Sequence, residues 1–192
     1  MTIALAATVW ALPAAALDEK KDEKEKLKLC ERRMCEMVVK KAPATGHVNC
    51  QLSKTWARKS IKDTSEAKKI SWGFGDARCF VDLKVPRSII VDALKQPEIK
   101  VELPLHTVDC EIEREKEVTK VRFTLGPKVL FKDGRAKKVW VNLKDVEGPG
   151  VIKGLAMTVA RLEDSIGLFQ KDLTKGINTF IAEKCPTVAA GR

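Results

Sequence analysis

The stretch ARCFVDLKV at residues 77–85 has the most regular two-residue alternation in the chain. Its odd-numbered positions are apolar, and the positions between them are mostly charged. A period of two is typical of a strand that buries one face and exposes the other. Pro86 ends this strand and suits the first turn of a short helix that we expect to run through Leu94.

Similar alternation on both sides of this stretch predicts further strands, near residues 48–52, 99–103, 108–112, 119–125, 129–131 and 139–143. Asp133-Gly134 lies between the last two and is a strong signal for a two-residue hairpin turn. The order predicts an antiparallel meander sheet of about five to seven strands with one solvated face.

Helical periodicity brackets the predicted strands. Apolar residues three and four apart predict an N-terminal helix over 27–41, ended by Pro43 and Gly46. A second stripe runs from Ile152 to Phe180. As one straight helix it would measure about 50 Å, more than the ~40 Å expected across a compact domain of this size. Either the domain is elongated or the helix breaks; we expect a break at Asp164-Ser165, before Gly167.

The predicted fold class is therefore α+β. An N-terminal helix precedes the sheet, and a long, broken C-terminal helix packs on one face of it. We assign the single secreted domain to residues 27–192 and a charged, flexible lead-in to residues 17–26, where acidic residues and lysines alternate.

Residues 1–16 carry no charge and end in Ala14-Ala15-Ala16, which predicts a signal peptide cleaved before Leu17. The alternative is an uncleaved membrane anchor, but the apolar run is shorter than the ~20 residues that a spanning helix needs. We therefore expect a periplasmic or secreted protein that is not transmembrane after cleavage.

Six cysteines in an exported chain predict a disulfide framework, and sequence alone allows fifteen pairings. Parity on the strands favours a Cys79–Cys110 bridge. Cys30 and Cys35 lie five positions apart on one predicted helix, so their side chains point in different directions and each needs a distant partner. We expect the remaining bridges to be Cys30–Cys185 and Cys35–Cys50.

Metal and redox chemistry are the other uses of cysteine. His47 and Cys50 have a ligand-like spacing, but the chain lacks the paired spacing of a structural zinc site. It also lacks the Cys-x-x-Cys pair of a thiol oxidoreductase. The sequence predicts no metal and no cofactor.

Composition also argues against catalysis. The chain has no Tyr, only two His, and none of the common nucleophile or nucleotide-binding motifs. We expect His106 to be a surface or edge residue, and the protein not to be an enzyme. The formal charge of +10 favours anionic partners, although export makes nucleic acid an unsuitable one.

The basic excess is densest between residues 120 and 144, where eight Lys and Arg face one acid, Asp133. Strand parity turns several of them outward together with a tryptophan, an amphipathic side chain that prefers interfaces. The candidate anion-binding residues are Lys120, Arg122, Lys128, Lys132, Arg135, Lys137, Lys138, Trp140 and Lys144. The plainer alternative is a charged outer face that keeps the sheet soluble.

Three functions fit these patterns. The first is a non-enzymatic binding protein that engages anionic envelope material, either lipid headgroups or cell-wall polymer, through the basic hairpin. The second is a carrier of a hydrophobic, lipid-like ligand held between the C-terminal helix and the sheet. The third is an envelope structural or adaptor subunit that binds a protein partner and uses residues 18–28 as a tether.

Overall fold

A computed structural model describes residues 17–114 and 117–191; the predicted signal peptide lies outside this range. Within it the strands are β1 (His47–Trp56), β2 (Ala77–Pro86), β3 (Glu98–Glu102), β4 (His106–Glu113), β5 (Val118–Leu125), β6 (Lys128–Lys132), β7 (Arg135–Trp140) and β8 (Leu143–Glu147). The helices are α1 (Glu23–Lys40), α2 (Arg58–Glu66), α3 (Arg87–Lys95), α4 (Gly150–Ile166), α5 (Gln170–Thr179), the π-helical turn η1 (Phe180–Lys184) and α6 (Cys185–Ala189).

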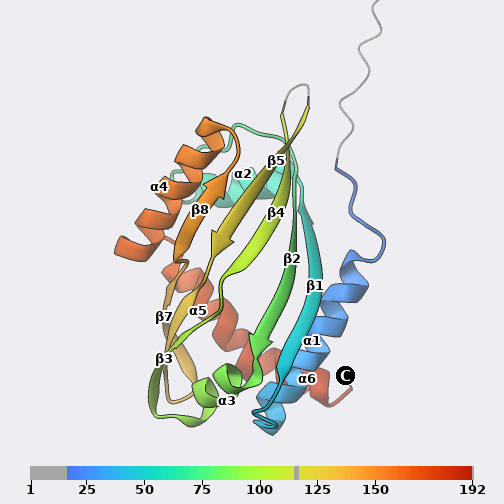
Figure 1. The fold of residues 1–192 in the computed structure, drawn as a ribbon, viewed down its shortest axis with the longest axis vertical. Coiled ribbons are helices and arrows are strands. Elements are labelled where there is room, and N and C mark those ends of the chain that lie inside the picture. Colours follow the sequence, from blue (N-terminus) through green and yellow to red (C-terminus); the bar gives the residue numbers. More distant parts are fainter. Residues whose placement is uncertain (1–16, 115–116, 192) are drawn as a thin grey trace, which may run out of the picture.

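The predicted α+β fold class is confirmed, with antiparallel strands, a helix before them and helices after them (Figure 1). The strands form two sheets instead of one meander. A five-stranded sheet has the order β1-β2-β4-β5-β8, and a three-stranded sheet has the order β3-β6-β7. Figure 1 shows the long five-stranded sheet in front, with α5 crossing behind it.

The chain leaves one sheet for the other at Gly126-Pro127 and returns at Val141-Asn142. Asn142 has a left-handed backbone, with φ of 50°, and its side chain donates to the Gly126 carbonyl at 2.7 Å. The Asp164 carboxylate accepts the N–H groups of Val141 and Asn142 at 2.7 and 3.0 Å. These bonds divide the return strand that the sequence predicts over 139–143 into β7 and β8.

The predicted hairpin turn is confirmed. Asp133 and Gly134 join β6 to β7 with φ of 51° and 69°. Two successive positive φ values define the type I′ turn, whose twist matches that of the flanking strands.

Helix α1 begins at Glu23, four residues before the predicted start. Glu23 is 1% exposed, and its carboxylate accepts bonds from the backbone N–H and the hydroxyl of Thr55, at 2.7 and 2.9 Å. This link to β1 makes residues 23–26 part of the fold, so the predicted lead-in over 17–26 is shorter than expected. The same holds for the predicted tether over 18–28.

The predicted break in the C-terminal helix is confirmed at Gly167, which ends α4 in the left-handed conformation with φ of 70°. The buried Glu163 carboxylate accepts the N–H of Phe169 at the start of α5. A break at Asp164-Ser165 also suggests that one of these residues caps the second helix. Asp164 does not do so, because its carboxylate binds the β7–β8 connection.

Helix α5 packs along the free edge of β7 with two side-chain amides. Asn178 accepts from the Ala136 N–H at 2.8 Å and donates to the Ala136 carbonyl at 3.0 Å. The Gln170 amide makes the same pair of bonds with Val139, at 2.9 and 3.1 Å, when it is oriented to satisfy both groups. These amides occupy hydrogen-bonding groups that an exposed edge strand would offer to another chain.

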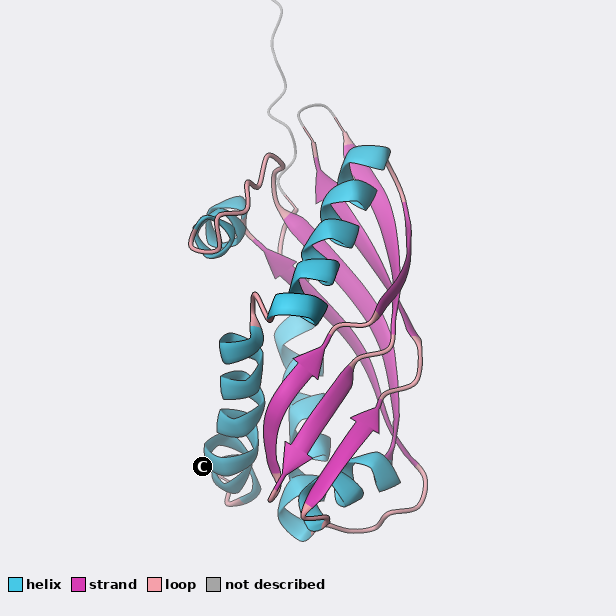
Figure 2. Cartoon of the chain, turned by 90° about the vertical axis from the view of Figure 1, so that its left-hand side faces the viewer, coloured by secondary structure: helices cyan, strands magenta, loops and turns pink. Residues whose placement is uncertain are grey.

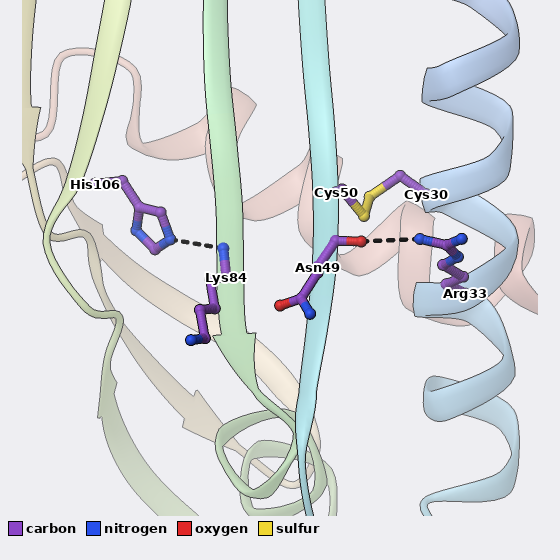
Figure 3. The surroundings of a disulfide bond; sticks show 6 residues. All are labelled: Cys30, Arg33, Asn49, Cys50, Lys84 and His106. Atoms are coloured by element: carbon purple, nitrogen blue, oxygen red, sulfur yellow. Dashed lines mark hydrogen bonds between the residues drawn. A yellow bond between two sulfur atoms is a disulfide. The ribbon is translucent and has the colours of Figure 1, made fainter.

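Three disulfides are present, and one of the predicted pairings is confirmed: Cys79–Cys110 joins β2 to β4. The other two predictions are wrong. The structure contains a helix–strand disulfide, Cys30–Cys50 (Figure 3), and a terminal disulfide, Cys35–Cys185.

Relative to the prediction, Cys30 and Cys35 have exchanged their disulfide partners, because of the way α1 packs on its neighbours. Positions five apart on a helix lie about 140° apart, so Cys30 and Cys35 do face different neighbours. The side that carries Cys30 packs on Val48 and Cys50 of β1, whereas the side that carries Cys35 packs on α6.

Candidate functional site

The predicted anion-binding residues are distributed over two sheets. Lys120 and Arg122 lie on β5 and Lys144 on β8, in the five-stranded sheet. The other six lie on β6 and β7, in the three-stranded sheet. The structure therefore does not bring all nine residues together.

Arg122 is occupied by acidic neighbours. Its side chain bonds to Asp109 at 2.7 Å and lies 3.9 Å from Glu147. The hydrogen bond that Arg122 donates to the Asp109 carboxylate raises the pKa of the Arg122 guanidinium. A count of charges along the sequence misses these carboxylates because they belong to neighbouring strands.

The three-stranded sheet turns its polar positions away from the core in three cross-strand rows. We call this surface the basic face. Its rows are Glu98–Lys132–Arg135, Lys100–Leu130–Lys138 and Glu102–Lys128–Trp140. Val101, Val129 and Phe131, on the opposite side of the same sheet, are buried.

Carboxylates on β3 neutralise part of the basic face. Lys128 lies 2.9 Å from Glu102, and Lys132 lies 3.8 Å from Glu98. Among the described residues, no carboxylate lies within 4.0 Å of Lys100, Arg135, Lys138 or the neighbouring Lys137. Four basic side chains thus remain to attract an anionic partner.

Two of these unpaired lysines lie over the side chain of Trp140. The Nζ atoms of Lys100 and Lys138 lie 4.6 and 4.8 Å from the centre of a Trp140 ring, within the range of cation–π attraction. Sequence parity predicted an outward Trp140 beside Lys138. It could not find Lys100, which comes from a strand forty residues earlier.

Helix α4 adds an apolar surface on the same side of the molecule. Figure 2 shows α4 and the three-stranded sheet both toward the viewer, one above the other. The apolar residues on the outer side of α4 include Val151, Leu162 and Ile166, which are 74%, 37% and 71% exposed. Leu162 and Ile166 belong to the apolar stripe that begins at Ile152, so the sequence predicts that they face the core. The core side of α4 is instead formed by Ile152, Met157 and Ala160.

An apolar pocket of about 380 Å³ lies between the C-terminal helix and the sheets. Its sixteen lining residues are all apolar or glycine, and they come from α1, β2, α3, β3, β6, α5 and η1 and the residue after β3. Val101, Val129 and Phe131 form a buried side of the pocket, on the back of the basic face. On α5 and η1, Ile177, Phe180 and Ile181 line it and are only half-buried.

A larger depression, of about 620 Å³, lies beside β1, β2 and β4. It is lined by charged residues of both signs, including Lys20, Asp82 and Lys84. Lys20 lies over the ring of Phe80, with its Nζ 4.3 Å from the ring centre. The mixed charges give this depression no preference for one kind of ion.

His106 is buried at the margin of this depression, so the expectation of a surface or edge histidine is wrong. Pairing between β2 and β4 ends at Val81–Val108, and the imidazole bridges the strands beyond that point. Nε2 accepts the Lys84 N–H at 3.0 Å (Figure 3), so Nδ1 carries the proton and donates to the Pro104 carbonyl at 2.7 Å. Both ring nitrogens are occupied by backbone groups, which gives His106 a structural role.

Within residues 17–114 and 117–191, no three His, Cys, Asp or Glu side chains are placed to hold a metal ion. No described helix combines the length and the apolar character needed to cross a membrane. Comparison of the chain with protein-family models, with curated proteins and with solved structures finds no match.

Proposed function

We propose that the protein is a non-enzymatic, periplasmic or secreted binding protein that docks on anionic lipid membranes. The contact surface is the basic face together with the exposed side of α4. The observation that carries this proposal is Trp140 with Lys100 and Lys138 over its ring, on a face where basic side chains outnumber acidic ones.

The size of the electrostatic attraction follows from the unpaired bases. A basic residue near an anionic membrane contributes about 1 kcal/mol. Four of them contribute about 4 kcal/mol, or roughly a thousandfold in the partition coefficient. Lys128 and Lys132 are left out of this sum because Glu102 and Glu98 already pair with them.

The apolar residues favour lipid over cell-wall polymer as the anionic material. Tryptophan prefers the boundary between headgroups and acyl chains. The exposed apolar side of α4 can enter that boundary, as interfacial amphipathic helices do. A polysaccharide offers no apolar layer to reward this exposure of Val151 and Ile166.

The disulfides support the proposed compartment. Three bridges, with no free cysteine among the described residues, are typical of proteins in oxidising environments. In such a compartment, the available anionic partners are the anionic lipids and polymers of the bacterial envelope or of cell surfaces.

The test is co-sedimentation with vesicles of phosphatidylcholine alone and of phosphatidylcholine mixed with phosphatidylglycerol. We expect binding to the mixed vesicles only, falling as salt is added. Lys100→Ala/Lys138→Ala should weaken it about 30-fold, because about 2 kcal/mol of attraction is removed.

The matched control is Lys84→Ala/Lys120→Ala, which removes the same charge from the five-stranded sheet and should bind more tightly than the first variant. The proposal would be contradicted if the two double-lysine variants lost vesicle binding equally, or if the wild-type protein bound the two kinds of vesicle equally. Val151→Ser/Ile166→Ser should also weaken binding. Unchanged binding there would indicate a purely electrostatic contact, such as one with an anionic polymer.

A further inference from the structure

We infer that the apolar pocket is a binding site for a single-chain amphiphile, with the hydrocarbon chain inside and the polar end at the rim. This ligand site goes beyond membrane docking and does not rest on it, because the pocket is lined from the inner side of the sheets. It requires only the pocket's size, lining and opening.

The lining determines the chemistry of the ligand. No charged, hydroxyl or amide side chain is among the residues that line the pocket. Water needs two to four polar partners to remain in a cavity, and apolar cavities stay dry and take up apolar molecules. A hydrocarbon chain therefore suits this pocket, whereas a sugar, a nucleotide or a metal ion does not.

The volume limits the ligand to one chain. An apolar cavity of about 150 Å³ holds one benzene molecule of six carbons. By the same ratio, the pocket of about 380 Å³ holds on the order of 15 carbon atoms. This matches one long acyl chain and leaves no room for the second chain of a diacyl phospholipid.

The half-buried apolar residues of the C-terminal helix agree with an incompletely filled interior. Ile177, Phe180 and Ile181 face the core cluster or the pocket, yet none of them is fully buried. No residue of α5 is fully buried, although the helix packs along β7. A chain in the pocket would cover these side chains and give them the contacts that the protein alone does not supply.

Gly176 lies at the rim of the pocket. It lines the pocket and is also exposed, whereas the lining residues on the three-stranded sheet are buried. A Cβ atom built on Gly176 would meet nothing within 4 Å. The position can therefore accept a larger side chain that narrows the opening without disturbing the helix.

The test measures myristate binding by calorimetry and by native mass spectrometry, with the wild-type protein and two matched variants. Gly176→Leu places a branched side chain at the rim. Gly154→Leu makes the same change on α4, where a Cβ also meets nothing within 4 Å. Both substitutions should keep the thermal midpoint at or above that of wild type, because leucine favours a helix more than glycine does.

We expect wild type and Gly154→Leu to bind one myristate, and Gly176→Leu to bind it at least about tenfold more weakly. Methyl NMR spectra of the wild-type protein supply a second readout that needs no variant. Myristate should shift the methyl signals of Val129, Ile177 and Ile181 and leave those of Val151 and Ile166 in place.

Three results would overturn the inference. They are no myristate binding by wild type, equal binding by both leucine variants, and methyl shifts confined to the exposed side of α4. The membrane-docking proposal and the ligand-site inference can also be refuted independently of each other. Lys100→Ala/Lys138→Ala should still bind myristate, and Gly176→Leu should still bind anionic vesicles.

Discussion

Replacing Asn178 by alanine tests how the C-terminal helix holds the edge of the three-stranded sheet. The side chain makes two hydrogen bonds to the backbone of Ala136, at 2.8 and 3.0 Å. Ala136 is 3% exposed, so its N–H and carbonyl groups have little access to replacement water. Asn178→Ala leaves both of these backbone groups without their partner.

The expected cost follows from the number of orphaned groups. A buried donor or acceptor that loses its partner costs about 1–3 kcal/mol. The sum for the two groups is therefore about 2–6 kcal/mol. This is a large share of a typical unfolding free energy of about 5–15 kcal/mol, and it corresponds to a fall in Tm of about 4–24 °C.

Urea unfolding gives the change in free energy, and amide hydrogen exchange locates it. We expect faster exchange at Ala136 in Asn178→Ala. Asn49→Ala, at an exposed strand position with no side-chain bond among the described contacts, should change stability by less than about 0.5 kcal/mol. If Asn178→Ala lowered the free energy of unfolding by an equally small amount and left amide hydrogen exchange at Ala136 unchanged, the clamping role of the Asn178 amide would be refuted.

Two further predictions concern the covalent and ionic links of the same helices. Paired Cys→Ala changes that remove the terminal disulfide, which closes a loop of 150 residues, should lower the free energy of unfolding by about 5 kcal/mol. The same changes at the helix–strand disulfide, which closes a loop of 20 residues, should lower it by about 3 kcal/mol. Equal losses in urea unfolding would contradict this difference. A hydrogen bond from Lys68 lowers the pKa of Asp172 on α5 below its usual value. The stabilisation by this pair is therefore present at neutral pH and is lost as pH falls through the lowered pKa. NMR titration of Asp172 should show that pKa return toward its usual value in Lys68→Met, and an unchanged pKa there would count against the pairing.

The local features of the fold could be predicted from the sequence because each depends on a few neighbouring residues. Alternation over 77–85 gives β2, since side chains on a strand point to opposite faces. Asp133-Gly134 gives the hairpin turn, and Gly167 ends α4, because both sites require a positive φ. The Cys79–Cys110 bridge follows from the shared parity of two strands.

Helix α2 was missed because its signal is weak. Of its residues, Ile61 is the apolar side chain that packs on a core cluster, so the segment shows no apolar stripe. Helix α4 shows the opposite failure. Its apolar stripe begins at the buried Ile152, but the last two positions of the stripe in this helix, Leu162 and Ile166, remain exposed.

Contacts between distant segments were decided by the tertiary structure alone. The local charge count for residues 120–144 could not include Glu98 and Glu102, which neutralise Lys132 and Lys128 across a strand pair. The sequence could not show that Lys100 would lie over Trp140 either. The same limit explains the exchanged disulfide partners of α1, because spacing along a helix gives the angle between two cysteines but not the element that each one meets.

The sequence by itself determined the periodic elements, the positions where they break and the excess of basic charge. Only the tertiary structure divided the strands between two sheets, selected the four unpaired bases and left a pocket beneath the C-terminal helix. Periodicity reports the environment on each side of one element. A pocket or a charge balance depends on how several elements fit together, and that fit is set by contacts between residues far apart in the chain.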